Sequence, residues 1–322
     1  MPARTRGGAL TAKLHGAVVR WFAAEARDLP WRDPDCSPWG VLVSEIMLQQ
    51  TPVVRVLPVW REWMERWPTP ADLAAESPGE AVRAWGRLGY PRRALRLHAA
   101  ATVIATEHGG ELPDSEDGLL ALPGVGGYTA AAVAAFAFGR RASVVDTNIR
   151  RVHARLVSGA ALPAPTLTAA ERRLAEALLP DDDATSVRWN AGVMELGALV
   201  CTARSPKCAA CPVADDCAWR AAGQPPPSYV PKGQAWHGTD RQVRGAVLAV
   251  LRAAPRPVPR IFLEGPAPAD SAPALTGSVS TGPELARLHG LAPAPEQLER
   301  CIVGLLADGL AVELASGLAL PH

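Results

Sequence analysis

Lysine is almost absent from this chain of 322 residues. It occurs only at Lys13, Lys207 and Lys232, although lysine and arginine together number 33. Positions 14 to 206 therefore offer no amine nucleophile, which excludes Schiff-base chemistry by a lysine from that part of the chain. The sequence also lacks an apolar run long enough to cross a bilayer, and its first residues lack the apolar core of a signal peptide. We expect a soluble, cytoplasmic protein without a membrane partner.

Net charge is also nearly absent, because 33 basic and 32 acidic residues leave a formal value of +1. The chain as a whole therefore exerts no strong attraction on nucleic acid. Arginine is concentrated locally in two clusters: Arg83, Arg87, Arg92, Arg93 and Arg96, and then Arg140, Arg141, Arg150, Arg151 and Arg155. Solvated helix faces would explain such clusters, but both flank candidate catalytic residues, so we expect them to contact phosphate.

No alternating pattern typical of a β-strand occurs before residue 222, which predicts an all-α fold there. Apolar spacing and capping signals predict helices over 10–27, 39–50, 91–108, 147–157 and 187–200. They also predict a helix start at Thr51 and a capping box at Thr168 and Glu171. A proline-rich linker follows at 223–234. Helical patterns at 241–253 and 295–310, followed by a hairpin-like stretch at 311–320, predict a small α+β module, winged-helix-like, at 235–322.

A glycine-rich turn joins two helical runs at Leu122 to Thr129. Its central residues are Gly124, Val125, Gly126 and Gly127. The glycines permit unusual backbone angles, so that main-chain N–H groups at the start of the next helix can point outward and bind an anion. A tight connection between packed helices explains the same pattern, and the turn alone does not decide between the two.

Four of the six cysteines form a C-x6-C-x2-C-x5-C array at Cys201, Cys208, Cys211 and Cys217. In a reducing compartment, thiols at such spacing are metal ligands before they are disulfides. A structural zinc site is one interpretation, and an iron–sulfur cluster fits the compact spacing better.

These motifs together resemble the helix-hairpin-helix base-excision glycosylases, and within them the MutY-type adenine DNA glycosylases. The resemblance covers roughly residues 10 to 222. It rests on the glycine-rich turn, on Asp146 within Val144 to Asn148, on the cysteine array, and on the octapeptide from Ser44 to Thr51. The segments 85–90 and 194–198 also resemble MutY segments.

The resemblance implies a glycosylase domain at 1–222. A six-helix barrel module would span about 36–138, and a cluster module would comprise 10–35 and 139–222. It implies one [4Fe–4S] cluster on the four cysteines. The partner would be double-stranded DNA containing adenine mispaired with 8-oxoguanine or guanine, bound by a nucleoid-associated monomer.

The chemistry requires two carboxyl groups. One acid must protonate the leaving base, and one carboxylate must face the oxocarbenium-like sugar. Glu45 lies in a mostly apolar predicted helix, where desolvation would raise its pKa. Asp146 stands at a helix start and could equally be a simple cap. The resemblance assigns the acid role to Glu45 and the sugar role to Asp146.

Further roles are implied by the same resemblance. Tyr128 occupies the position where the strand-cleaving relatives carry a lysine, so we expect base removal without strand cleavage. Asn148 would orient the sugar site. Three sets would contact DNA or base: the wedge residues Gln50 and Tyr90, their neighbours Thr51 and Leu88, and the adenine-pocket residues Trp31, Arg32 and Glu195. For Trp31, Leu88 and Tyr128, packing in the core is a competing interpretation.

The sequence departs from MutY in its last third. The module at 235–322 is shorter than the β-rich domain that usually reads 8-oxoguanine, and it contains no Phe-Ser-His segment. Two other functions remain as alternatives. One is a thymine or uracil mismatch glycosylase, and the other is a DNA-binding module without catalytic activity.

Overall fold

The computed structural model describes residues 3–230, 233, 235–265 and 282–322, and these residues are mostly helical. No described residue before 222 lies in a strand, which confirms the predicted all-α fold. None of the helices in the described part is both long enough and apolar enough to span a membrane. Two compact units are present, and each is described by itself.

Unit 1 comprises Met1–Glu45, Leu112–Ala121 and Val125–Lys232. Its helices are α1 (Ala3–Glu25), the first part of α2 (Pro38–Leu48), α7 (Glu116–Leu120), α8 (Gly127–Phe136), α9 (Thr147–His153), α10 (Ala169–Leu178), α11 (Asp183–Leu199) and α12 (Ala218–Ala221). Short 3-10 turns lie at Pro30–Arg32, Cys208–Ala210 and Ala214–Asp216.

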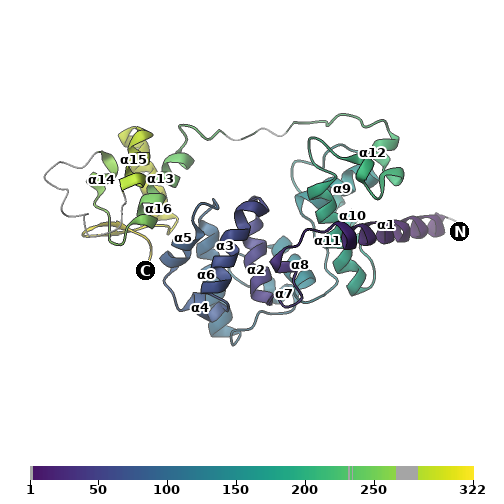
Figure 1. Ribbon diagram of the computed structural model, residues 1–322, viewed down its shortest axis with the longest axis horizontal. Coiled ribbons are helices and arrows are strands. Elements are labelled where there is room, and N and C mark those ends of the chain that lie inside the picture. Colours follow the sequence, from purple (N-terminus) through teal and green to yellow (C-terminus); the bar gives the residue numbers. More distant parts are fainter. Residues whose placement is uncertain (1–2, 231–232, 234, 266–281) are drawn as a thin grey trace. The chain divides into compact units, whose positions relative to one another are not determined.

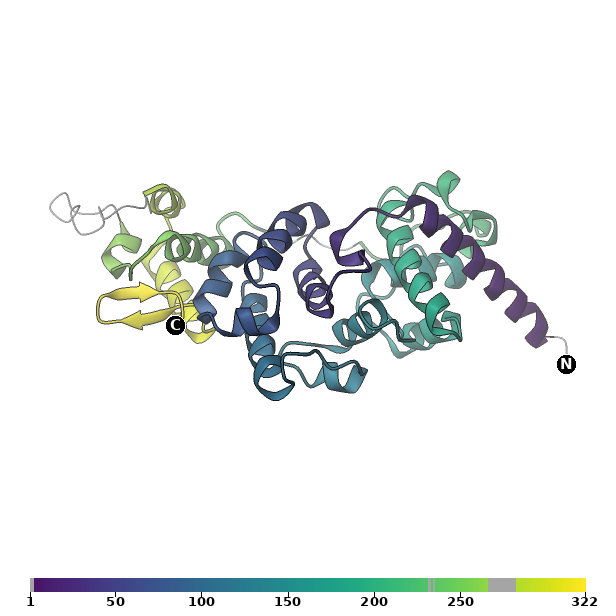
Figure 2. The same cartoon turned by 60° about the horizontal axis from the view of Figure 1, so that its bottom comes forward.

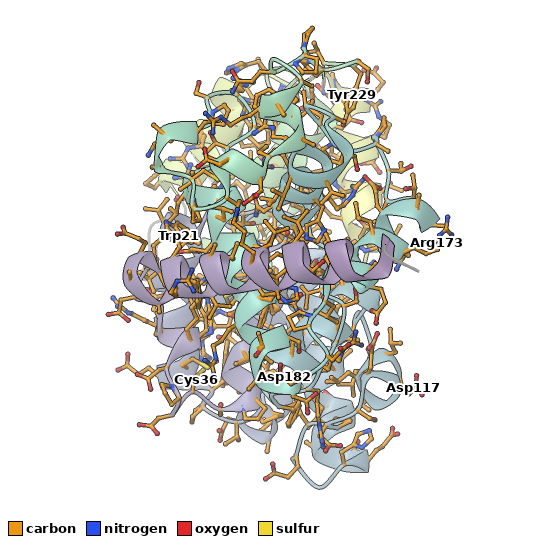
Figure 3. All side chains as sticks on the ribbon, turned by 90° about the vertical axis from the view of Figure 1, so that its right-hand side faces the viewer. Trp21, Cys36, Asp117, Arg173, Asp182 and Tyr229 are labelled. Carbon is orange, nitrogen blue, oxygen red and sulfur yellow. The ribbon has the colours of Figure 1, made fainter. Side chains whose placement is uncertain are left out.

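The helix α11 is the centre of unit 1, because α1 and α9 both pack along it (Figure 1). Asp182, labelled in Figure 3, caps its start by accepting a hydrogen bond from Thr185 N at 2.8 Å. Gly192 lets α1 approach closely, since a Cβ there would lie 2.8 Å from Val18 Cγ1. Tyr229, also labelled in Figure 3, donates its hydroxyl to the Pro163 carbonyl at 2.9 Å.

Unit 2 comprises Ile46–Glu111, Leu122–Gly124 and Gly233–His322. It contains the end of α2, α3 (Val53–Arg66), α4 (Pro70–Ala74), α5 (Pro78–Trp85), α6 (Arg92–Glu107), α13 (Asp240–Ala253), α14 (Arg260–Glu264), α15 (Gly282–Gly290), α16 (Pro295–Ala307), β1 (Val312–Leu314) and β2 (Gly317–Ala319). Its core includes three buried tryptophans in edge-to-face contact, with Trp63 centred 4.9 Å from Trp67 and 5.6 Å from Trp85.

The C-terminal module of unit 2 is a small α+β unit of helices and one hairpin (Figure 2). Strands β1 and β2 are antiparallel, and Val258 adds a bridge to Leu318. Gly317 is required at the turn into β2, because its φ is 132° and a Cβ would lie 2.3 Å from Val258 O. Among the residues described, the helices and the hairpin confirm a small α+β module, and its likeness to a winged helix stays a prediction.

Two elements differ from the predicted ones. The helix predicted over 147–157 ends as α9 at His153 and continues as a π-helical turn, Ala154–Ser158, which Gly159 closes with a φ of 71°. Helix α3 begins after Pro52 instead of Thr51, because the Thr51 hydroxyl is bonded elsewhere. The capping box at Thr168 and Glu171 is as predicted.

Candidate active site and iron–sulfur segment

Three acidic or phenolic side chains come together in unit 1. Glu45 is buried on α2, and the Tyr128 hydroxyl on α8 donates a hydrogen bond to its Oε2 at 2.8 Å. Asp146 is close enough that its charge raises the pKa of both groups. A site of this kind can hold and deliver a proton, because the surrounding protein excludes water from the two carboxyl groups.

Burial controls the protonation of this group. It raises the pKa of Glu45 to about 7, assisted by the Asp146 charge and opposed by the bond from Tyr128 and the charge of Arg32. Burial and the neighbouring carboxylates raise the pKa of Tyr128 well above its ordinary value. Near neutral pH, Glu45 is therefore partly protonated and Tyr128 is a neutral phenol.

Asp146 is both a helix cap and a member of this group. Its Oδ1 accepts from Ile149 N at 2.6 Å, and its Oδ2 accepts from Asn148 Nδ2 at 2.8 Å. Burial raises the pKa of Asp146, although these bonds oppose the change. Gly197 on α11 lets Asn148 sit there, since a Cβ at Gly197 would lie 2.6 Å from Asn148 Cβ.

The three predicted adenine-pocket residues also lie in unit 1. Glu195 is fully buried and accepts bonds from Arg27 Nε and Nη2, both at 2.7 Å, and from Arg32 Nη2 at 2.9 Å. Burial alone would raise the pKa of Glu195, but the two arginines outweigh it and lower the pKa to about 2. Trp31 is buried in the adjoining 3-10 turn. Glu195 is thus a permanently charged group at neutral pH.

Only one of the three glycines in the glycine-rich turn adopts the unusual backbone angles that we expected. Gly124 has a φ of 76°, and a Cβ there would lie 2.5 Å from Arg96 Cβ, so this position requires glycine. Gly126 and Gly127 do not adopt positive φ, which corrects our expectation for them. A Cβ on either would meet nothing within 4 Å, so neither position requires glycine for space. Val125 is buried beneath the turn.

The predicted wedge residues lie in unit 2 and share a strained backbone. Gln50 has a φ of 54° and Tyr90 a φ of 48°, values that few non-glycine residues adopt. Both side chains are exposed. Their neighbours Thr51 and Leu88 are buried, and the Thr51 hydroxyl bonds to Leu88 O at 3.3 Å. The two exposed side chains therefore project from loops that are tied together.

The four cysteines of the array are all unpaired thiols, none fully exposed. They lie near enough to one another that Cys201, Cys208 and Cys217 all raise the pKa of Cys211, after burial, to about 11. Arg155 Nη1 donates to Cys201 Sγ at 3.3 Å and Gln224 Nε2 to Cys208 Sγ at 3.5 Å. Such donors suit metal-bound thiolates, so the donor set fits an iron–sulfur cluster. In the described part of the chain the thiols, like other His, Cys, Asp and Glu side chains, are not grouped closely enough for three of them to hold one metal ion, so this fit rests on the kind of ligand and on the two donors.

Comparison with known proteins identifies the family. Residues 43–177 match the HhH-GPD superfamily base excision DNA repair protein model, and residues 201–217 match the iron-sulfur binding domain of endonuclease III. An adenine DNA glycosylase of Mycobacterium tuberculosis is 54% identical over 77% of this chain and 81% of its own. One of Mycolicibacterium smegmatis is 47% identical over 93% of both chains. The chain belongs to the adenine DNA glycosylases. It is a DNA N-glycosylase of base excision repair with an iron–sulfur binding segment.

A solved structure agrees with the fold of this adenine DNA glycosylase. The structure of a thermostable thymine-DNA glycosylase superposes with a TM-score of 0.60 at 28% identity, over 68% of this chain and 99% of that one. The match confirms the helix-hairpin-helix glycosylase fold.

The arginine clusters of the glycosylase correct a sequence prediction. Arg151 donates to Asn148 Oδ1 and Cys201 O, both at 2.8 Å, and Arg155 bonds to several carbonyls around Cys201. Other members pair with acids or carbonyls: Arg83, Arg92, Arg93, Arg140, Arg141 and Arg150. Among described residues, the exposed side chains of Arg87 and Arg96 have no such partner. Arg93, Arg151 and Arg155 are buried, so the expectation of phosphate contact is wrong for these three and stays a prediction for the other seven.

Three functional contacts of this glycosylase were not foreseen from the sequence. Arg27 is the principal partner of Glu195, and Arg151 joins the cluster segment to Asn148. Arg93 donates to the carbonyls of Ile46, Met47, Gln49 and Gly89. The sequence shows where arginines are concentrated, but it does not show which groups they contact when those groups lie far away in the chain.

Proposed function

We propose that this enzyme removes adenine mispaired with 8-oxoguanine, and also with guanine, from double-stranded DNA. It hydrolyses the N-glycosidic bond, works as a monomer and leaves the strand intact. The observation that carries the proposal is the group of buried Glu45 with half-buried Tyr128 and Asp146, and the 2.8 Å bond between the first two. Membership of the adenine DNA glycosylases supports adenine as the base that is removed, and this group of side chains supports the hydrolytic mechanism.

Glu45 is the general acid. With a pKa of about 7 it carries a proton near neutral pH, and it gives this proton to N7 of the extruded adenine. As the C1′–N9 bond breaks, positive charge develops on the sugar, and Asp146 stabilises it. Ionised Glu45 then accepts a proton from the attacking water. Asn148 holds the Asp146 carboxylate toward the sugar through its 2.8 Å bond.

Tyr128 supports Glu45 and keeps the enzyme monofunctional. Its phenol stays neutral, because burial and two nearby carboxyl groups raise its pKa well above the ordinary value. A neutral phenol donates to the Glu45 carboxylate but forms no Schiff base with the sugar. No lysine occurs between Lys13 and Lys207, so no amine in that stretch opens the sugar for strand cleavage.

Recognition begins with extrusion of the adenine, because a stacked base hides its glycosidic bond. Gln50 and Tyr90 fill the space it leaves, and their positive φ values support this role by holding exposed side chains outward. Thr51 and Leu88 contact the opposite base beside them. Trp31, Arg32 and Glu195 line the adenine pocket. Ionised Glu195 with its two arginines offers a fixed polar surface for the base.

The glycine-rich turn grips the backbone of the adenine strand. The exposed residues Gly126 and Gly127 begin α8, and the unpaired backbone amides at a helix N-terminus bind a phosphate group. Gly124 and Val125 hold the turn in shape, one through its positive φ and the other through burial.

The cofactor is one [4Fe–4S] cluster held by Cys201, Cys208, Cys211 and Cys217. When bound, it would stabilise the loops of 201–217 as a structural centre. Purified protein should be brown with broad visible absorption and should contain iron and sulfide. A colourless protein containing zinc would refute this assignment.

The test is a glycosylase assay on duplexes containing A:8-oxoguanine, A:G, T:G and U:G. Alkali after the reaction should cut the adenine strand in the first two, and omission of alkali should leave it intact. The alternative is a thymine or uracil glycosylase, and the structural likeness to a thymine-DNA glycosylase is the observation that supports it. Activity on T:G or U:G with none on adenine would establish this alternative. Unchanged activities in Glu45→Gln and Asp146→Asn would mean that these residues do not catalyse.

A further inference from the structure

The C-terminal module is hydrogen-bonded to α5 at Gly79, Val82 and Arg83. Gly79 N, at the start of α5, donates to Pro321 O at 2.9 Å. In the second half of α5, Val82 O accepts a hydrogen bond from Arg252 Nε of α13 at 2.9 Å. Arg83 donates in return to Arg252 O. Hydrogen bonds to backbone carbonyls therefore attach the module to both the first and the second half of α5.

The fit at this contact is close. A Cβ on Gly79 would lie 2.3 Å from Pro321 O and 3.0 Å from Leu320 Cβ, so a glycine is needed there. Burial lowers the pKa of Arg252 to about 10. An arginine whose charge is desolvated in this way is a specific contact, because its hydrogen bonds to α5 must replace lost water.

A second contact reaches the start of α6. The Asp308 carboxylate, at the end of α16, forms an ion pair with Arg92 Nη1 at 3.1 Å and accepts a hydrogen bond from Arg244 Nη2 at 2.5 Å. Gly304 makes room for Arg244, since a Cβ would lie 2.1 Å from its Nη1. Arg92 follows Tyr90 by two residues, so this ion pair ties the module to the segment that carries the proposed wedge.

Arg93, the residue after Arg92, also holds the segment that carries Tyr90. Arg93 donates to Gln49 O at 2.6 Å, to Thr51 Oγ1 at 3.0 Å and to Gly89 O at 3.0 Å. Its guanidinium also lies over the Tyr90 ring, 5.4 Å from the centroid. A non-glycine residue with a φ of 48° persists only where surrounding contacts enforce it.

We propose that the described part of the C-terminal module, residues 240–265 and 282–321, braces the α5–α6 segment so that Tyr90 stays poised to enter the duplex. Asp308 and Arg92 are positioning residues in this arrangement, which rests on the proposed wedge role. The module assists extrusion of the base and takes no part in bond hydrolysis. The exposed face of α16 carries the acidic residues Glu296 and Glu299, and Glu299 is paired with Arg260, which disfavours phosphate contact there and agrees with a mechanical role.

The test compares Asp308→Asn and Gly79→Ala with the control Arg260→Gln, which breaks ion pairs on the same module away from α5 and α6. Single-turnover excision is measured for adenine opposite 8-oxoguanine and for adenine opposite an abasic site. Unpaired adenine is easily extruded. We expect both variants to be about three- to tenfold slower on the paired substrate and nearly normal on the unpaired one, with the control unchanged on both.

Fluorescence of 2-aminopurine at the adenine position reports extrusion independently of excision, and it should rise less with the two variants than with the control. Equal behaviour of Asp308→Asn and Arg260→Gln on the paired substrate would overturn the brace, as would equal slowing on both substrates. If Gly79→Ala fails to fold, Asp308→Asn decides alone. A wild-type protein that releases no adenine would instead refute the proposed function, and the fluorescence comparison would still judge the brace.

Discussion

Replacing Glu45 with glutamine should stabilise the protein at alkaline pH while abolishing adenine excision. The Glu45 carboxyl is buried, and its pKa in the folded protein is about 7 against an ordinary value of 4.5. Ionisation of this group is therefore costly in the folded state. Glutamine has nearly the same shape and cannot ionise.

The sign and size follow from proton linkage. Below about pH 4.5 the carboxyl is protonated in both the folded and the unfolded chain, so it has no effect. Between the two pKa values the unfolded chain releases the proton and the folded chain keeps it, so stability falls as pH rises. Above about pH 7 the loss is complete, at about 3 kcal/mol for a difference of roughly 2.5 pH units.

The assay is urea denaturation at about pH 5 and about pH 8, with the free energy of unfolding taken from the midpoint and slope. Glu45→Gln should lose about 3 kcal/mol less than the wild type between these conditions. Glu62→Gln is the matched control, since Glu62 is exposed on α3. Identical pH dependence in Glu45→Gln and the wild type would refute a buried, neutral Glu45.

Three further predictions concern the surroundings of the site. Gly197→Ala should slow excision by about 10- to 100-fold in single-turnover assays with little loss of DNA affinity, because the new Cβ displaces Asn148; unchanged kinetics would contradict this. Glu195→Gln should destabilise the protein by about 3 kcal/mol in urea denaturation at neutral pH, because Arg27 and Arg32 lose their buried counter-charge; equal stability would show that water compensates both arginines. His153→Leu should resist acid better than the wild type, because burial lowers the His153 pKa to about 4 and stability is lost as pH falls from 6.5 towards that value; equal acid midpoints would argue against a neutral His153.

Features encoded within a few residues were predictable from the sequence. The caps at Asp146 and Thr168 follow from local hydrogen bonds, and the structure has both. The cysteine array and the glycine-rich turn are also local, and they led to the correct family. Helix ends were less exact where a neighbour in space intervened. Thr51 fails to cap α3 because its hydroxyl accepts a bond from Arg93, 42 residues away.

Partners distant in the chain were not predictable. The arginines of the two clusters were expected at phosphate, yet most are bound to carboxylates or carbonyls of the protein itself. Arg27 finds Glu195 across 168 residues. A sequence shows that a buried acid needs a counter-charge but not which arginine supplies it, because that depends on how helices such as α1 and α11 pack.

Different hydrogen bonds allow Glu45 and Asp146 to take the two different roles proposed for them. Burial raises the pKa of both, but their hydrogen bonds differ. Glu45 accepts one bond, from Tyr128, whereas both oxygens of Asp146 accept bonds from its own helix start and Arg151 lies nearby. Donors stabilise a carboxylate, so Asp146 is the better anion and Glu45 the better acid. Exchanging the two residues would therefore fail even with unchanged positions, because each role depends on the donors around it.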